Sequence, residues 1–340
     1  MDEPQVSPPP PSADSPAATP VSGDSRHINF FVGRGGLRAG WRLLIFLALL
    51  VAIFSAATAL SRALHHRPSR LDGAIFTPKV VLIGEASSFA LVLLASAIMA
   101  QFEPRKIADY GLPWHRAFRR EFWQGAAVGF AGISALLAAM RAAGVFHLES
   151  LALHGAAAVQ YAVFWGLAFL FVGLFEEFSF RGYALFTVTT GIGFWPAALA
   201  SSLLFGYVHH GNSGETWLGA FNAGFVGLLF CLILRRTGDL WMAIGFHTAW
   251  DWGESYFYGV PDSGQLAAGH LFNVSFSGPR WLSGGTVGPE GSWLCTLLLV
   301  VLWAIFLVWL RDAKYPNPAA MSAHQPQLNT PGIIDRSIPT

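Results

Sequence analysis

Long apolar segments recur along the chain and are separated by short polar or glycine-rich turns such as 211–214 and 237–239. A helix needs about 20 apolar residues to cross the hydrocarbon core of a bilayer, and most of these segments reach or approach that length. The eight predicted helices are Gly40–Leu64, Val80–Gln101, Phe122–Val145, Leu151–Phe175, Pro196–His209, Trp217–Leu234, Leu240–Tyr258 and Trp293–Leu310. Short turns between them favour antiparallel neighbours. The predicted fold is therefore all-α, a polytopic transmembrane bundle of about eight helices.

Composition agrees with a membrane environment. Hydrophobic residues make up 53% of the chain and charged residues only 12%, whereas soluble domains carry about a quarter charged residues. The net charge of +1 and the lack of a long basic run argue against a nucleic-acid partner, which would need clustered Lys and Arg for phosphate contact. Cys231 and Cys295 lie in apolar segments without metal-ligand spacing. We interpret both as buried apolar side chains.

The same pattern divides the chain into six parts. A Pro/Ser-rich N-terminal tail over residues 1–27 and a C-terminal tail over 315–340 contain too little apolar surface to order themselves. The parts between them are N-terminal transmembrane helices over 40–145, a transmembrane core over 151–258, a loop over 259–291 and a last helix over 292–311. The core holds the candidate chemistry.

Positive charge predicts how the chain is oriented, because Lys and Arg accumulate in cytoplasmic loops. With the N-terminus in the cytoplasm, most basic clusters face that side, including those near 34–42, 105–120, 235–236 and 311–314. The loop after the first predicted helix is the exception, since it also carries basic residues. We expect a cytoplasmic N-terminus, with the first hairpin as the least determined part.

A pair of glutamates ends the fourth predicted helix in the string EEFSFRG, which begins at Glu176. Ionisable side chains within a membrane span cost at least a few kcal/mol and therefore indicate function. Glu177 and Arg181 are four residues apart and share a helical face, so Arg181 can neutralise Glu177. Glu176 points about 100° away and is the freer carboxylate. The alternative is a pair of glutamates solvated at the end of a span.

Two further strings place histidine in apolar surroundings. His209 ends FGYVH, in which Phe205 lies on the same helical side, and by itself it could be an interfacial residue. His247 and Asp251 begin and end HTAWD, and their spacing aligns an imidazole with a carboxylate. That pair could instead be a structural hydrogen bond between helices. Three such strings in one chain indicate a common polar site.

These groups suit hydrolysis. A desolvated carboxylate such as Glu176 can act as a general base toward water, and His209 could share the proton or ligate a metal. His247 with Asp251 could bind metal or stabilise an oxyanion. Two histidines and a carboxylate suit zinc with one position left for water. The string HExxH is absent, so any ligands must come from different helices.

These strings resemble a known family. EEFSFR is similar to the EExxxR motif, FGYVH to FxxxH, and HTAWD to HxxxN/D of the CAAX-protease and bacteriocin-processing (CPBP) intramembrane proteases. The stretch RRTGDLWMAIGFHTAWD also resembles that family's approach to its last motif. The resemblance covers Phe171–Trp252, about a quarter of the chain. It identifies the 151–258 core as CPBP-like.

The resemblance implies an intramembrane endopeptidase, similar to the CAAX prenyl proteases, of a bacterial cytoplasmic membrane. Its expected partners are the lipid bilayer and a membrane-associated peptide or protein substrate. Carried over by motif, Glu176 activates water with His209, Glu177 and Arg181 support the site, and His247 with Asp251 holds a metal or the oxyanion. The expected ligands of zinc or another divalent metal are Glu176, His209, His247 and Asp251, and the motifs leave metal-dependent and metal-free mechanisms open. Asp251 stands where Asn is common, which adds negative charge and favours a metal.

One difficulty concerns depth. In the predicted topology Glu176 lies at the inner end of one span, whereas His209 lies near the outer end of the next. A shared site needs both residues at one depth. Continuing the fourth helix through Arg181 toward Thr187 would move Glu176 toward the middle of the membrane.

Two other functions compete with this interpretation. A rhomboid-like serine protease would use Ser213, from the GNSG string of GxSG form, with His247, but this leaves the EEFSFR string unexplained. A non-catalytic scaffold or a transporter could also keep carboxylates and histidines inside the membrane. A transporter would favour internal symmetry and broken helices at matching positions, which are not convincing here.

Overall fold

The computed structural model describes residues 30–33, 36–65, 76–103, 105–212 and 214–316. Nearly all residues of the two predicted tails, 1–27 and 315–340, lie outside these ranges. The chain divides into two compact units, Met1–Arg38 and Ala39–Thr340. In the described part of the first unit, β1 (Val32–Gly33) pairs with β2 (Gly36–Leu37) in an antiparallel hairpin.

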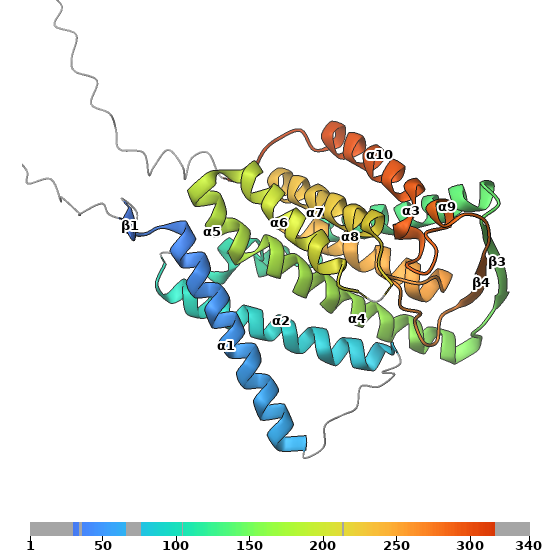
Figure 1. Ribbon diagram of the computed structural model, residues 1–340, viewed down its shortest axis with the longest axis horizontal. Helices are drawn as coiled ribbons and strands as arrows, with labels where there is room; N and C mark the ends of the chain where they lie inside the picture. Colours follow the sequence, from blue (N-terminus) through green and yellow to red (C-terminus); the bar gives the residue numbers. More distant parts are fainter. Residues whose placement is uncertain (1–29, 34–35, 66–75, 104, 213, 317–340) are drawn as a thin grey trace, which may run out of the picture. The chain divides into compact units, whose positions relative to one another are not determined.

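The second unit is a bundle of helices (Figure 1). Its α-helices are α1 (Ala39–His65), α2 (Pro78–Gln101), α3 (Arg120–Ala142), α4 (Gly155–Arg181), α5 (Tyr183–Ile192), α6 (Phe194–His209), α7 (Trp217–Thr237), α8 (Trp241–Asp251), α9 (Arg280–Ser283) and α10 (Trp293–Trp309). The remaining helical segments are the 3₁₀ turns η1 (Ile107–Tyr110), η2 (Trp114–Arg116) and η4 (Pro289–Gly291), and the π-helix η3 (Trp252–Tyr258), which continues α8. The prediction of an all-α polytopic bundle is confirmed.

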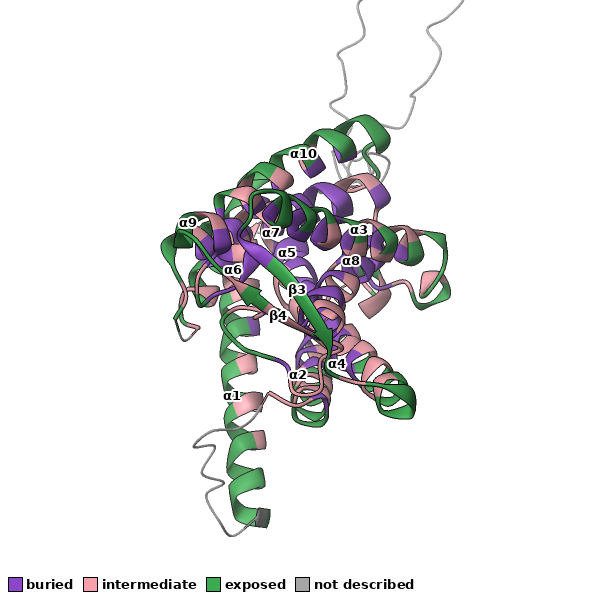
Figure 2. Cartoon of the chain, turned by 90° about the vertical axis from the view of Figure 1, so that its right-hand side faces the viewer, coloured by how far each residue is buried: buried purple, intermediate pink, exposed green. Residues whose placement is uncertain are grey.

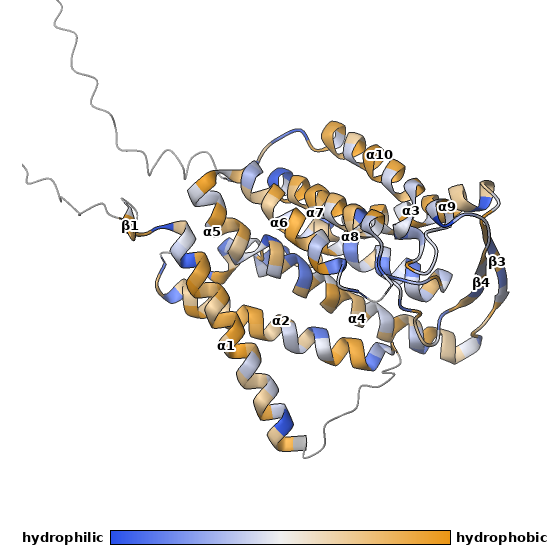
Figure 3. Ribbon diagram, viewed as in Figure 1, coloured by the Kyte–Doolittle hydropathy of each residue, from blue (hydrophilic) through white to orange (hydrophobic). Residues whose placement is uncertain are grey.

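Five of the described helical segments are long and apolar enough to cross a membrane by length and composition. They are α1, α2, α3, α7 and the combined segment Gly155–Ile192, which contains α4 and α5. Only 6% of the apolar window of α1 is buried within the protein, so its side chains are left for lipid to solvate. Figure 3 shows that hydrophobic residues predominate along α1 and α10. The predicted windows that begin at Pro196, Leu240 and Trp293 correspond to the shorter helices α6, α8 and α10.

Two predicted helix ends were wrong, because the residues between α3 and α4 form a strand. The third helix ends at Ala142 rather than Val145, and the fourth begins at Gly155 rather than Leu151. Between them, β3 (Phe146–Leu151) pairs antiparallel with β4 (Phe272–Phe276), at the right of Figure 1. The apolar residues of β3 look like the start of a helix in sequence. Their partner strand lies far along the chain, and a local pattern does not reveal such pairing.

The fourth helix continues through Arg181, as the depth argument required. The helix ends at Gly182, whose backbone leaves the helical conformation with ψ −128°. A side chain at this position would overlap the carbonyl and ring of Phe178, so the break requires glycine. Two short helices follow, α5 and α6, with Gly193 at φ +84° between them. The sequence predicted only the second of them, as the short segment that begins at Pro196. The turn at Gly193 lets α6 run back through the bundle, so that His209 at its end lies near Glu176.

Helix α8 lies in the centre of the bundle and is largely buried, as is much of α7 (Figure 2). Glycines permit its close contact with α3. A methyl group added at Gly129 of α3 would overlap the Phe246 backbone, and one added at Gly245 of α8 would overlap the Phe122 backbone. Small residues at such contacts let helix backbones approach and pack in membranes. The polar residues of α8, such as His247 and Asp251, are thereby enclosed by other helices.

We expect Gly129→Val to destabilise the protein by about 1–3 kcal/mol, because the larger side chain forces α3 away from α8. Gly84→Val on α2 is the matched control, since nothing lies within 4 Å of a side chain added there. The midpoint of thermal unfolding in detergent measures the effect. Equal midpoints for the two variants would contradict the packing described for α3 and α8.

Candidate active site

The six polar residues predicted from the sequence meet around one cavity of about 290 Å³. They are Glu176, Glu177 and Arg181 on α4, His209 at the end of α6, and His247 and Asp251 on α8. Four of them line the cavity directly, whereas Glu177 and Arg181 lie fully buried behind it. The structure therefore brings together all six candidate residues of the three sequence strings.

Glu177 and Arg181 form an ion pair inside the protein. Arg181 Nη1 donates to Glu177 Oε1 over 3.1 Å, and neither side chain is exposed. The guanidinium carbon lies 4.2 Å from the centre of the Phe205 ring and 5.8 Å from that of Phe230, where cation–π attraction adds to the pairing. Buried charges are tolerated when they are paired in this way. The pair links α4 to the aromatic side chains of α6 and α7.

Glu177 also orients His247. The His247 Nδ1 atom lies 3.1 Å from Glu177 Oε1, and an ionised carboxylate only accepts hydrogen bonds, so we assign the proton to Nδ1. The ring stacks on Phe230 with centroids 5.6 Å apart. Its other nitrogen, Nε2, is then directed toward Glu176 and Asp251, at 3.7 and 3.5 Å.

His209 is oriented in a similar way by the backbone of its own helix. Its Nδ1 lies 2.9 Å from the Phe205 carbonyl oxygen, which can only accept, so Nδ1 donates the hydrogen bond. Its Nε2 is therefore the nitrogen that faces Glu176, at 3.9 Å from Oε2. Both histidines thus present Nε2 to the same carboxylate.

Glu176 Oε2 has no hydrogen-bond partner among the described residues although the atom is buried. Its separations from His209 Nε2 and His247 Nε2, 3.9 and 3.7 Å, exceed those of direct hydrogen bonds. Polar groups at such distances are commonly bridged by water. The arrangement can therefore hold one water molecule between a carboxylate and two imidazoles.

The predicted metal ligands do not enclose a single point. Ligands of a tetrahedral zinc ion bound at 2.0–2.2 Å lie roughly 3.4 Å apart. Among the four predicted donors, the pairs His209 and Glu176, His247 and Glu176, and His247 and Asp251 are separated by 3.9, 3.7 and 3.5 Å. These are separate pairs, and no three of these four described donors lie within 4.8 Å of one another. Among the described residues, three donors within 4.8 Å of one another occur in a different group, Glu254, Asp262 and Glu290. A metal held by the predicted donors stays a prediction that this geometry does not favour.

Sequence reasoning missed an acidic wall of the cavity, where Asp262 and Glu290 line the cavity and the buried Glu254 lies beside them. Burial raises the pKa of Asp262, and burial together with the Asp262 charge raises the pKa of Glu290. Glu254 could have been found from the sequence, because it follows His247 by seven residues and so lies on the same helical face. The other two lie in the predicted 259–291 loop, where no local pattern places a side chain.

The fold and the site define a class, an α-helical polytopic membrane protein with a buried glutamate and histidine site. Residues 157–253 match the family model described as type II CAAX prenyl endopeptidase Rce1-like. The matched segment contains all six predicted site residues. Residues 157–253 are thus similar to the Rce1-like family, and the predicted resemblance to the CPBP proteases is confirmed. Comparison with curated proteins and with solved structures finds no match.

The buried ion pair gives a test of the site's framework. We expect Arg181→Met to destabilise the protein by about 3–5 kcal/mol, because it leaves the Glu177 charge buried without a partner. The double variant Glu177→Gln/Arg181→Met should recover much of this loss, since no unpaired charge remains. Thermal unfolding in detergent measures both effects.

Arg141→Met on the exposed end of α3 is the control and should change the unfolding midpoint little. A double variant no more stable than Arg181→Met alone would contradict the explanation from unpaired charge.

Proposed function

We propose that this protein is an intramembrane endopeptidase that hydrolyses peptide bonds of membrane-associated proteins, with Glu176 as the base that activates water. The observation that carries the proposal is the buried, unpartnered Glu176 Oε2, which faces Nε2 of both His209 and His247. The Rce1-like match over 157–253 supports a protease of the CAAX-processing type.

The proposed reaction begins with a water molecule held by Glu176 and His209. Glu176 accepts a proton from this water while its oxygen attacks the carbonyl carbon of the scissile peptide bond. The resulting oxyanion accepts a hydrogen bond from the protonated Nε2 of His247. The protonated Glu176 then delivers its proton to the amide nitrogen, the C–N bond breaks, and the products leave as a carboxylic acid and an amine.

Glu177 and Arg181 act as positioning residues in this proposal. Glu177 Oε1 accepts the Nδ1–H hydrogen bond of His247 over 3.1 Å, which fixes the direction of Nε2. Such outer contacts orient catalytic imidazoles. In this proposal His247 is an imidazolium with a proton on each nitrogen, so Nε2 can donate to the oxyanion. Asp251 faces the same Nε2 at 3.5 Å and stabilises the charged imidazole during oxyanion formation.

The surroundings of the cavity suit a membrane-bound substrate. Apolar helices enclose it on several sides, and its lining combines the polar site with aromatic side chains such as Phe169 and Phe246. Excluding bulk water strengthens electrostatic interactions with the transition state. We propose a peptide bond close to the membrane surface as the substrate, as in CAAX processing.

The central prediction concerns Glu176→Gln. We expect cleavage of a membrane-proximal peptide by the purified protein to fall by about 10²–10⁴-fold, because the amide cannot accept the proton of water. The unfolding midpoint should stay near that of the wild type. The rate of product formation in detergent or liposomes measures the effect.

Glu85→Gln is the matched control, because Glu85 of α2 lines the same cavity and forms no ion pair with either histidine. It should retain most of the activity. Undiminished cleavage by Glu176→Gln would eliminate the proposed mechanism.

Substitution of Ser213 separates this proposal from the rhomboid alternative. Ser213 lies outside the described residues. We expect Ser213→Ala to cleave at the wild-type rate, because no step assigned above uses a serine nucleophile. A loss of activity as large as that of Glu176→Gln would favour the serine mechanism instead.

A further inference from the structure

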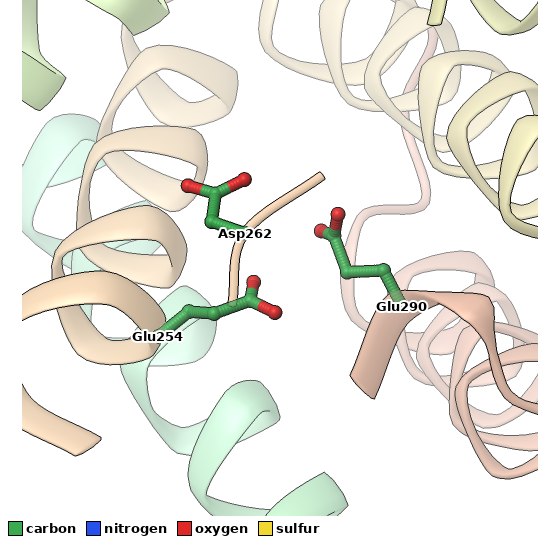
Figure 4. Close-up of side chains that lie close together, drawn as sticks. All are labelled: Glu254, Asp262 and Glu290. Atoms are coloured by element: carbon green, nitrogen blue, oxygen red, sulfur yellow. The ribbon is translucent and has the colours of Figure 1, made fainter. Parts of the chain in front are cut away.

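Three carboxylates from separate segments converge beside the proposed active site. Glu254 belongs to η3, Asp262 to the loop that follows it, and Glu290 to η4. One oxygen from each lies within 4.8 Å of the others, and Figure 4 shows the three side chains close together. Oxygen atoms around Ca²⁺ lie at 2.3–2.6 Å from the ion, so roughly 5 Å is the largest separation that one ion can span.

The cluster lacks a basic partner. None of the three carboxylates forms an ion pair with Lys or Arg in the part of the chain that the structure describes. Glu254 is fully buried, and Asp262 and Glu290 are partly buried. Several buried negative charges at such distances repel one another and must be neutralised by protons or by a cation.

Hydrogen bonds fix the orientation of each carboxylate through one oxygen. Trp250 Nε1 donates to Glu254 Oε2 over 3.0 Å and to Glu290 Oε1 over 2.9 Å. Ser255 Oγ donates to Asp262 Oδ2 over 3.0 Å. Outer contacts of this kind are typical of metal ligands. The remaining oxygen of each carboxylate accepts no hydrogen bond from a described residue.

Glu254 has a buried carboxylate oxygen that also indicates a bound ligand. Its Oε1 atom is buried and has no hydrogen-bond partner among the described residues, and its side chain is fully enclosed by protein. The carboxyl group is directed toward Asp262 and Glu290 in Figure 4. An unsatisfied buried acceptor is costly, and a cation between the three side chains would satisfy it.

We propose that Glu254, Asp262 and Glu290 bind one divalent cation of the oxygen-preferring class, Ca²⁺ in first place, at the wall of the active-site cavity. The all-oxygen donor set suits Ca²⁺, Mg²⁺ or Mn²⁺ and differs from the nitrogen-containing set predicted for zinc. Asp262 and Glu290 line the cavity, which provides the path of entry and room for water ligands. The ion joins η3, which carries Glu254, to the two segments that carry Asp262 and Glu290.

The segments that carry Asp262 and Glu290 are already held together by backbone contacts. Gly264 N donates to the Val287 carbonyl over 2.8 Å, and Gly288, at φ +109°, packs so closely on Pro261 that a side chain would overlap its carbonyl. Asp262 and Glu290 are therefore presented at a fixed spacing before any ion binds. Preorganised ligands reduce the cost of binding.

This inference does not rest on the proposed function, because cation binding is measured without substrate. Purified protein is treated with a chelator, dialysed, and titrated with Ca²⁺, Mg²⁺ and Mn²⁺ separately by calorimetry. We expect saturable binding of one Ca²⁺ per chain and a rise in the unfolding midpoint with Ca²⁺ concentration. Asp262→Asn and Glu290→Gln should each weaken binding by at least about tenfold, because each removes a charged ligand.

Two variants control for other carboxylates. Glu176→Gln in the proposed active site and Glu149→Gln on the exposed face of β3 should both bind Ca²⁺ as the wild type does. Tb³⁺ in place of Ca²⁺ gives an independent readout, since excitation of Trp250, which donates to two of the ligands, should sensitise its luminescence.

Absence of saturable binding for all three cations in the wild type would overturn the proposal. Ca²⁺ binding retained in Asp262→Asn, or lost in Glu176→Gln, would also overturn it by placing the ion elsewhere. If one ligand variant fails to fold, the other variant and the wild-type titration still decide. Saturation by Mg²⁺ or Mn²⁺ alone would support the site and change only the preferred ion.

Discussion

The buried ion pair between Glu177 and Arg181 is the interaction on which the candidate site depends. Glu177 accepts hydrogen bonds from Arg181 and from Nδ1 of His247, so one carboxylate oxygen joins α4 to α8. The Arg181 guanidinium lies against Phe205 of α6 and Phe230 of α7. Four helices are thereby held in register around the cavity. In an apolar bundle an unpaired charge is costly, so this arrangement has few alternatives.

A second constraint is the close packing of α8. Its polar residues could not face lipid without a large cost, and the structure encloses them with α3, α4 and α7. Glycine makes this possible, because Gly129 and Gly245 bring the backbones of α3 and α8 into contact. The short helix α6 then ends at His209, which faces Glu176.

The two polar groups of the cavity differ in their chemistry. On one side, Glu176 faces two histidines whose Nδ1 atoms are already engaged, which leaves Nε2 of each for a water molecule or a substrate. On the other side, the acidic wall offers only oxygen atoms. A cation bound there would neutralise the charge of the wall and fix the loops that border the site. The proposed hydrolysis and the proposed cation binding would therefore use separate donors.

The sequence by itself determined the membrane character, the helical class and six residues that the structure brings together as a candidate site, because apolar length and helical spacing are local properties. The three strings also predicted the Rce1-like segment. Only the tertiary structure decided that β3 pairs with β4, that a separate helix α5 precedes α6, and that Asp262 and Glu290 join Glu254. Each of these depends on contacts between residues far apart in the chain. Such contacts are selected by packing and by the pairing of buried polar groups, which no local pattern encodes.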